Sequence, residues 1–404
     1  MIVHKNSLRQ TISAATVFAV VSTVALVPNA HSAPKQIAVK QLSLLAKDAS
    51  AEGMVVTNKA VVTYSNVVGN TSDIQVRAID FAGAEIWSKT IDSGWDEVAT
   101  AINVDTQGSI WLAGNSATGT LSESNTAIVG ALNPDSVTAE ATSELRADMT
   151  NIALWQFSAS GELLSQVNST QVQPAIVDGL SANATGVSIL LSRDNGQSIF
   201  SLKAGIFSKE LKLGTIKSKF KAILRGADGS TSLFGSSSET LGGKKLVGKE
   251  DGILLKVSKT GSISSVVRSS ATSATRDWQS ATSSNFLTGI VKSGKKIETA
   301  LTKFNSSFTP TWTARYASTG VSFGTLGANG SVFAIFEPTA VPKGITGWKV
   351  IKGQSVALQL DSKGALVGAF TNSLLATPIS TGYSVEGGLI VLTKAGDLLR
   401  VAAR

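Results

Sequence analysis

The sequence predicts an all-β protein, a seven-bladed β-propeller with four antiparallel strands in each blade and a ring closed by an N-terminal strand. Three observations predict this fold. Apolar and polar residues alternate along most of the chain, and short turns, most of them glycine-bearing, interrupt the alternation. Two kinds of turn then follow one another in strict order, seven of each, with a repeat of roughly 40–60 residues, which is typical of propeller blades.

Residues 1–33 are predicted to be a signal peptide that lies outside the fold. Lys5 and Arg9 form a basic start, residues 12–27 are apolar, and "PNAHSA" supplies small residues for cleavage after Ser32. A retained anchor is the alternative. No later stretch approaches the roughly 20 apolar residues that span a bilayer, so we expect a secreted, extracytoplasmic domain over 34–404 without a transmembrane segment.

The composition excludes several kinds of site. The chain has no cysteine, and both of its histidines, His4 and His31, fall in the predicted signal peptide. Beyond residue 33, Ser-His-Asp and Cys-His nucleophile systems and zinc sites built from His and Cys are therefore impossible. We expect no cofactor and no metal. Without the signal peptide, 34 Lys and Arg face 28 Asp and Glu, a net charge of +6, which fits either attraction to polyanions or simple solubility.

Residues 73–91 and 97–114 show the two kinds of hairpin, one around Gly83 and one around Gly108. The Gly108 kind recurs at 57–62, Gly186, Gly229, Asn285, Gly330 and Gly387. The Gly83 kind recurs at Gly161, Gly205, Gly261, Ser306, Gly364 and Gly396.

The last repeat has room for three strands, at about 378–384, 388–393 and 397–403. The alternating segment 35–46 is the natural fourth strand, because it would cover the open edge of that blade and bring the chain ends together.

Two motifs carry a resemblance to a known family. "AIDFAGAEIWSK" followed by "AINVDTQGSIWLAG", over 73–115, resembles the secreted bacterial β-propeller repeat of the SBBP type. The first motif is also distantly similar to the tryptophan-docking motif of quinoprotein-like propellers, one residue short between Asp80 and Trp87. The second is similar to the Asp-box of sialidases, one residue long between Asp105 and Gly108. Both departures weaken an analogy with enzymes.

The clustered tryptophans have a structural interpretation. Trp87 and Trp111 lie on strands next to glycine turns, and we expect them to pack between neighbouring blades. Trp95 precedes a strand, where packing and surface contact are both open.

In such a ring, the turns between second and third strands share one face with the connections between blades. The long insertions are predicted on this face: 115–150, which is acidic and has a possible short helix at 138–146; 236–250; 292–296; and 337–354. Three of them carry cations, and the last also carries an aromatic residue that we expect to be exposed. The candidate ligand-binding residues are Lys244, Lys245, Lys249, Lys292, Lys295, Lys296, Lys343, Trp348, Lys349 and Lys352.

These residues predict a non-catalytic binding or scaffold protein that contacts an anionic polysaccharide or cell-surface polymer. The alternative is that the lysines keep the loops soluble and that Trp348 anchors its own loop. A protein-interaction scaffold and a carboxylate-dependent propeller enzyme, a glycosidase or lyase, are the other functions left open. We expect a monomer and no nucleic-acid partner.

Overall fold

The computed structural model describes residues 36–117, 149–270, 273–283 and 285–401. Every described strand belongs to one unit, Gln36–Arg404. The predicted signal peptide, the predicted helix at 138–146 and most of the 115–150 insertion lie outside the described residues. Within the described ranges, no helix is long and apolar enough to cross a membrane.

The first two blades follow the predicted hairpins closely. The first blade contains β4 (Gly53–Val56), β5 (Ala60–Val68), β6 (Ser72–Asp80) and β7 (Glu85–Ile91), and the second contains β8 (Glu97–Val104), β9 (Ile110–Ser116), β10 (Asn151–Phe157) and β11 (Leu163–Thr170). All neighbouring strands within each blade are antiparallel. In β6, residues Ile74, Val76 and Ala78 alternate with polar residues and are buried, as the period of two requires.

The third and fourth blades have the same meander. The third contains β12 (Ile176–Asn183), β13 (Gly186–Arg193) and β14 (Gly196–Lys203), with two short pieces, β15 (Ile206–Phe207) and β16 (Leu211–Lys212), in the outermost position. The fourth contains β17 (Ser218–Arg225), β18 (Thr231–Ser237), β19 (Asp251–Val257) and β20 (Ile263–Ser269).

The remaining repeats before the last do not form separate blades. One eight-stranded sheet, here called the double sheet, contains β21 (Thr275–Ser283), β22 (Phe286–Ser293), β23 (Lys296–Phe304), β24 (Pro310–Leu326), β25 (Val332–Pro338), β27 (Val356–Leu360), β28 (Leu366–Thr371) and β2 (Lys40–Gln41). β24 joins its two parts, since it pairs with β23 up to Ala317 and with β25 from Ser318 onward.

The prediction of seven blades is therefore wrong. The described residues form five separate blades, because the strand over 310–326 continues from one expected blade into the next without a break.

The closing blade confirms the predicted use of an N-terminal strand. It contains β29 (Pro378–Ser384), β30 (Gly388–Thr393), β31 (Asp397–Val401) and, from the other end of the chain, β3 (Ser43–Lys47), which pairs antiparallel with β31. The residues before β3 pair with strands outside the closing blade: β1 (Ile37–Ala38) lies parallel to β26 (Ile345–Thr346), and β2 lies parallel to β28. The N-terminal segment thus connects the double sheet to the closing blade.

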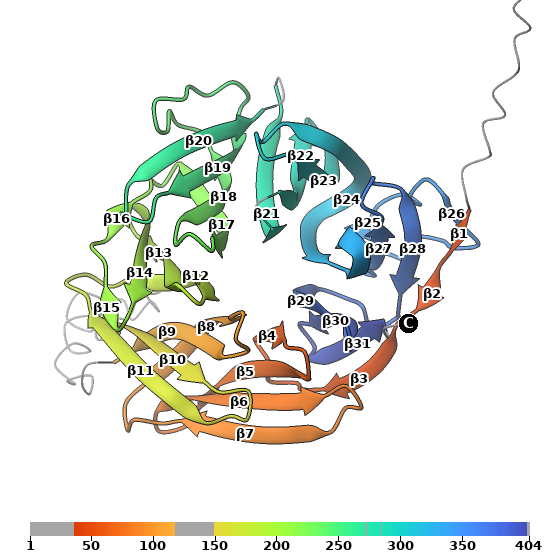
Figure 1. Ribbon diagram of the computed structural model, residues 1–404. Helices are drawn as coiled ribbons and strands as arrows, with labels where there is room; N and C mark the ends of the chain where they lie inside the picture. The colour runs from red at the N-terminus through yellow and green to blue at the C-terminus, as the bar shows by residue number, and fades with distance from the viewer. Residues whose placement is uncertain (1–35, 118–148, 271–272, 284, 402–404) are drawn as a thin grey trace, which may run out of the picture. The chain divides into compact units, whose positions relative to one another are not determined.

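Within this unit the sheets follow one another around a common centre (Figure 1). The innermost strands contact each other in sequence, from β4 through β8, β12, β17, β21, β24 and β29 and back to β4. Hydrophobic clusters fill the space between neighbouring sheets; one of them joins Val76 of the first blade to Leu112 and Trp155 of the second. Complete burial of a side chain such as Leu112 contributes about 1.5–3 kcal/mol.

Most of the predicted turns form as expected. Gly83 and Gly108 have φ values of 95° and 87°, which side chains with a Cβ rarely adopt. In the turn at 305–309, Phe308 takes the corresponding position with φ 56°, and the short 3₁₀ helix η1 (Ala328–Gly330) forms another of these turns. Gly396 joins the second and third strands of the closing blade rather than the third and fourth, because the fourth strand there is β3.

The predicted packing roles of Trp87 and Trp111 are confirmed. Trp87, on β7, stacks on Phe157 of the second blade with ring centroids 6.5 Å apart. Trp111, on β9, packs against the cluster between the second and third blades, and its indole N–H donates to Asp105 Oδ2 at 3.0 Å. Trp95 is 41% exposed and therefore lies at the surface.

Candidate functional site

One edge of the sheets carries the predicted lysine residues. In an antiparallel meander, alternate turns lie at opposite edges, so turns between second and third strands share an edge with the connections to the next sheet. We call this edge the insertion face. Its described members include 238–250, 294–295 and 339–355, together with the connection 213–217. Two of these are long, as predicted, whereas 294–295 is a tight turn rather than an insertion.

The connection 238–250 is fixed by a buried carboxylate. Asp251 accepts hydrogen bonds from the main-chain N–H groups of Val247 (2.9 Å) and Gly248 (2.8 Å) and pairs with Arg268 at 3.1 Å. Burial opposes ionisation of Asp251, but these donors outweigh it and lower its pKa. Asp251 thus fixes the end of the connection, and Lys244, Lys245 and Lys249 are exposed to solvent.

The second lysine group lies on the hairpin of β22 and β23. Lys292, Lys295 and Lys296 are all exposed. Lys296 Nζ lies 2.9 Å from Glu298 Oε1, so this lysine is partly neutralised.

The third group lies on the connection 339–355. Gly353 N–H donates to Glu337 Oε1 at 2.7 Å, and β26 in the middle of the connection pairs with the N-terminal strand β1. Lys343, Lys349 and Lys352 are exposed. Trp348 is half-buried and packs against the cluster that contains Phe336, so the expectation of an exposed aromatic is wrong, and its packing fits the alternative that it anchors its own loop.

The structure brings these three lysine loops together through their neighbours. Thr275 pairs with Lys292 in the β21–β22 ladder and also forms a parallel bridge with Glu250 at the end of the first loop. Ala317 pairs with Glu298 beside the hairpin and accepts a hydrogen bond from Thr339 N–H at the start of the third loop, at 3.0 Å. Among the nine lysines, Lys296 is the only one with an ion pair inside the described ranges.

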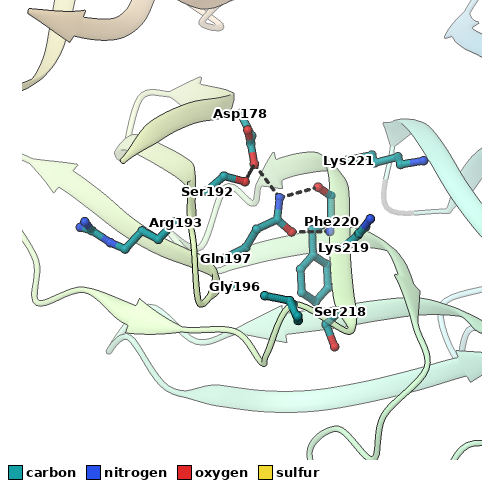
Figure 2. A pocket seen from close by; sticks show the side chains of 10 residues that line it. Asp178, Ser192, Arg193, Gly196, Gln197, Ser218, Lys219, Phe220 and Lys221 are labelled. Atoms are coloured by element: carbon teal, nitrogen blue, oxygen red, sulfur yellow. Dashed lines mark hydrogen bonds between the residues drawn. The ribbon is translucent and has the colours of Figure 1, made fainter. Parts of the chain in front are cut away.

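A pocket of about 460 Å³ opens on the same face, next to the connection 213–217. Figure 2 shows the side chains that line it. Its walls come from the third and fourth blades and include Asp178, Gln197, Phe220 and Lys221. Gln197 spans the two blades, because its side-chain oxygen accepts from Phe220 N–H at 2.5 Å while its Nε2 donates to Phe220 O (3.0 Å) and to Asp178 Oδ2 (2.6 Å). Ser238 N–H donates to Lys217 O, which connects the lysine loop to the 213–217 segment beside the pocket.

Two of the pocket's charged residues owe their position to irregular pairing. Asp178 and Lys221 are the extra residues where the β12–β13 and β17–β18 registers shift, and such bulges turn a side chain away from the regular alternation. Lys221 Nζ donates to Asp277 Oδ2 of the double sheet at 2.5 Å. Asp277 is buried, and this burial raises its pKa in spite of the neighbouring lysine.

Sequence reasoning missed Asp178 and Lys221, because a regular alternation does not reveal a bulge. It missed Asp277 because the burial of this residue depends on what packs against its strand. The sequence did contain a partial signal of these bulges, because the hairpin motif around Gly108 ends in a second glycine, Gly114. A Cβ on Gly114 would stand 1.9 Å from Val98 O, and one on Gly235 would stand 1.9 Å from Lys219 O, each where an inner strand shifts register. Such glycines mark the strand opposite a bulge.

The described part of the insertion face presents cations, scattered carboxylates and hydroxyls. Over the ranges that the structure describes, no group of three or more His, Cys, Asp or Glu residues could hold a metal ion. The arrangement is suited to attracting anions.

No protein-family profile matches the chain, and no curated protein matches it either. The SBBP resemblance therefore stays a prediction.

Solved structures do resemble the chain. Virginiamycin B lyase from Staphylococcus aureus, as the selenomethionine-substituted protein, aligns with a TM-score of 0.52 at 11% identity over 90% of this chain and 99% of that one. A catalytically inactive histidine-to-alanine variant of the same lyase with quinupristin aligns with a TM-score of 0.50 at 12% identity over 89% and 98%. The WD40 domain of Toxoplasma gondii coronin aligns at 9% identity, with a TM-score of 0.49, over 92% and 85%. At these identities the likeness concerns the fold alone: the chain is a β-propeller.

Proposed function

We propose that the protein is an exported binding protein that takes up an anionic polymer, such as an acidic glycan or a cell-wall polymer, on its three lysine loops. The observation that carries the proposal is the side-by-side placement of these loops, eight of whose nine lysines have no ion pair within the described ranges. Fixed cations that face solvent together attract a polyanion more strongly than the same cations dispersed.

The pocket next to the connection 213–217 supports the same function. Lys219 at its wall is exposed and has no ion pair in the described part of the chain, so it extends the cationic surface toward the third blade. Arg193 contributes less, because its guanidinium is already engaged by Glu210 at 2.9 Å and by the main-chain oxygen of Gln173 at 2.6 Å. Trp348 is assigned no stacking role, since it is half-buried and packs against the cluster that contains Phe336.

A lyase activity is not proposed. The variant of the lyase named above that has alanine in place of a histidine is catalytically inactive. In this chain the histidines are His4 and His31, both inside the predicted signal peptide. The carboxylate-dependent enzyme stays the weaker alternative, because the buried Asp277 is engaged with Lys221 rather than free to act as an acid.

Binding of the chain from residue 34 to dextran sulfate and to isolated cell-wall polymers, at low and high salt, tests the proposal. We expect binding that weakens steeply as salt rises. Changing four lysines of the loops, Lys244, Lys245, Lys292 and Lys295, to Glu should reduce the affinity at least about 100-fold, since each reversal removes an attraction and adds a repulsion.

A matched control places the same change at exposed lysines of the opposite edge: Lys59, Lys203, Lys259 and Lys363. We expect this variant to bind nearly as well as the unmodified chain. Equal loss of binding in both variants would mean that net charge alone attracts the polymer, and absence of binding at low salt would refute the proposal.

A further inference from the structure

Exposed apolar side chains are concentrated on the insertion face. Among the described residues, twenty large apolar side chains are exposed: eleven on the turns and strand ends of the insertion face, six on outermost strands and three on the opposite edge. The three on the opposite edge are Ile206, Leu326 and Val385. The insertion face therefore exposes more large apolar side chains than the opposite edge of the same sheets, although folding does not require such exposure at either edge.

Five of these side chains stand among the lysine loops, and we call them the apolar tips. They are between 36% and 68% exposed, and they are Leu246, Val247, Val321, Val341 and Ile351. Three of them, Leu246, Val247 and Ile351, lie in segments that begin and end with lysine, "KKLVGK" over 244–249 and "KVIK" over 349–352, and Val341 lies two residues before Lys343. Exposed aliphatic side chains gain nothing from a dissolved, well-hydrated polyanion.

We infer that the lysine loops and apolar tips together dock on the surface of an anionic lipid bilayer. This inference rests on the cationic surface of the proposed function and extends it to a second anionic ligand, a lipid surface. Lysines next to a negatively charged leaflet are attracted to it, and apolar side chains at the same depth enter the boundary between headgroups and acyl chains. The first and third loops each supply both kinds of group within a few residues.

The distribution of the apolar tips favours a bilayer over a protein partner. A stable protein interface has a continuous, well-packed apolar centre surrounded by a polar rim. Here the tips come from separate connections, 238–250, the middle of β24 and 339–355, and lysines lie between them. A fluid bilayer accepts each tip independently and does not require them to be contiguous.

The underlying loops are held firmly enough to present these groups. Asp251 binds the main chain at Val247 and Gly248, directly behind one pair of tips. In the third loop, Ile345 is buried and β26 pairs with β1, which fixes the segment that leads to Ile351.

Vesicle co-sedimentation tests the inference with the chain from residue 34, which holds every described strand. Vesicles of phosphatidylcholine with phosphatidylglycerol are compared with phosphatidylcholine alone, and dextran sulfate binding is measured in parallel. One variant changes all five apolar tips to Thr, and a matched control changes five apolar residues exposed elsewhere to Thr: Ile86, Ile206, Leu326, Val367 and Val385.

We expect the unmodified chain to sediment with the anionic vesicles and not with the neutral ones. The apolar-tip variant should lose at least about tenfold in vesicle affinity while keeping its dextran sulfate affinity, and the control variant should match the unmodified chain.

Two results would overturn the inference and leave the proposed function standing: dextran sulfate binding without vesicle binding, or vesicle binding that the apolar-tip variant retains in full. Failure to bind either ligand at low salt would overturn both.

Discussion

The indole N–H of Trp87 donates a hydrogen bond of 3.1 Å to the main-chain oxygen of Ala159, so a side chain of the first blade binds a turn of the second. The same contact recurs within the double sheet, where Trp312 donates to Ser362 O at 3.2 Å. In both turns a glycine lies against the indole: a Cβ on Gly161 would stand 2.5 Å from Trp87, and one on Gly364 would stand 2.8 Å from Trp312. Neighbouring repeats are thus joined by a tryptophan and the glycine turn that accepts it.

Replacing Trp87 with Ala should lower the free energy of unfolding by about 3 kcal/mol, because it opens a gap beside Phe157 and leaves Ala159 O without its donor. Chemical denaturation measures the loss. The control is Trp95→Ala, which removes a surface indole and should cost less than about 0.5–1 kcal/mol. Similar losses at both positions would contradict the packing role of Trp87.

The N-terminal strand should contribute strongly to stability. Leu42 lies just before β3, is buried, and belongs to the cluster with Leu399 and Phe370, so Leu42→Ala should cost about 2–4 kcal/mol. Leu44 on the same segment is 51% exposed, and Leu44→Ala should have a small effect. Removing residues 34–46 should abolish cooperative unfolding, whereas unchanged stability of that truncated chain would refute the closing role.

The glycines opposite the bulges should not accept a side chain. Gly235→Ala would place a Cβ 1.9 Å from Lys219 O, a main-chain atom that cannot move without disrupting the β17–β18 ladder. We expect a loss of about 3 kcal/mol or failure to fold. Gly69→Ala, whose Cβ would make an ordinary 3.5 Å contact with Thr71 O, is the control and should be nearly neutral. A neutral Gly235→Ala would show that the bulge is adjustable.

The Lys221–Asp277 pair should couple the fourth blade to the double sheet. A double-mutant cycle with Lys221→Met and Asp277→Asn should give a coupling energy of about 1 kcal/mol, reduced from the value of a buried pair because the Lys221 side chain is 43% exposed. Of the two single variants, Lys221→Met should destabilise more at neutral pH, since it leaves a buried carboxylate without its cation. Strictly additive effects would exclude an energetic role for the pair.

Glu97 should make stability depend on pH. Its side chain is buried, Ser93 Oγ donates to Oε1, and Oε2 has no hydrogen-bond partner in the described part of the protein. Burial raises the pKa of Glu97 above the ordinary 4.5, and the nearby Asp73 and Asp92 raise it further. The folded state therefore binds this proton more tightly than the unfolded state, so the contribution is favourable below the ordinary pKa and is lost as pH rises through the raised value.

Glu97→Gln should flatten this part of the pH profile and raise the stability at neutral pH relative to the unmodified chain. Denaturation midpoints measured between about pH 4 and 8 report the effect. An unchanged slope would show that Glu97 titrates alike in both states.

The sequence by itself determined the strands, their hairpins and the closing segment. Gly83 and Gly108 sit where the backbone needs positive φ, and the alternation in 73–80 places its apolar residues on one face, so both features are local. The short last repeat likewise required a fourth strand from elsewhere, and β3 supplies it. The order of the turns also predicted that the lysine-bearing loops share one face.

Tertiary structure alone decided the rest. The continuity of β24 joined two repeats into the double sheet, because Gly320, with a φ of 121°, interrupts the pairing between Ser318 and Ser322 without ending the strand. A glycine in the sequence does not distinguish such a strand from two strands with a connection. The bulges that expose Asp178 and Lys221, the packing of Trp348 and the burial of Asp277 depend on partners far away in the chain. Local alternation cannot encode such partners, since pairing register and burial are set by what packs against a strand.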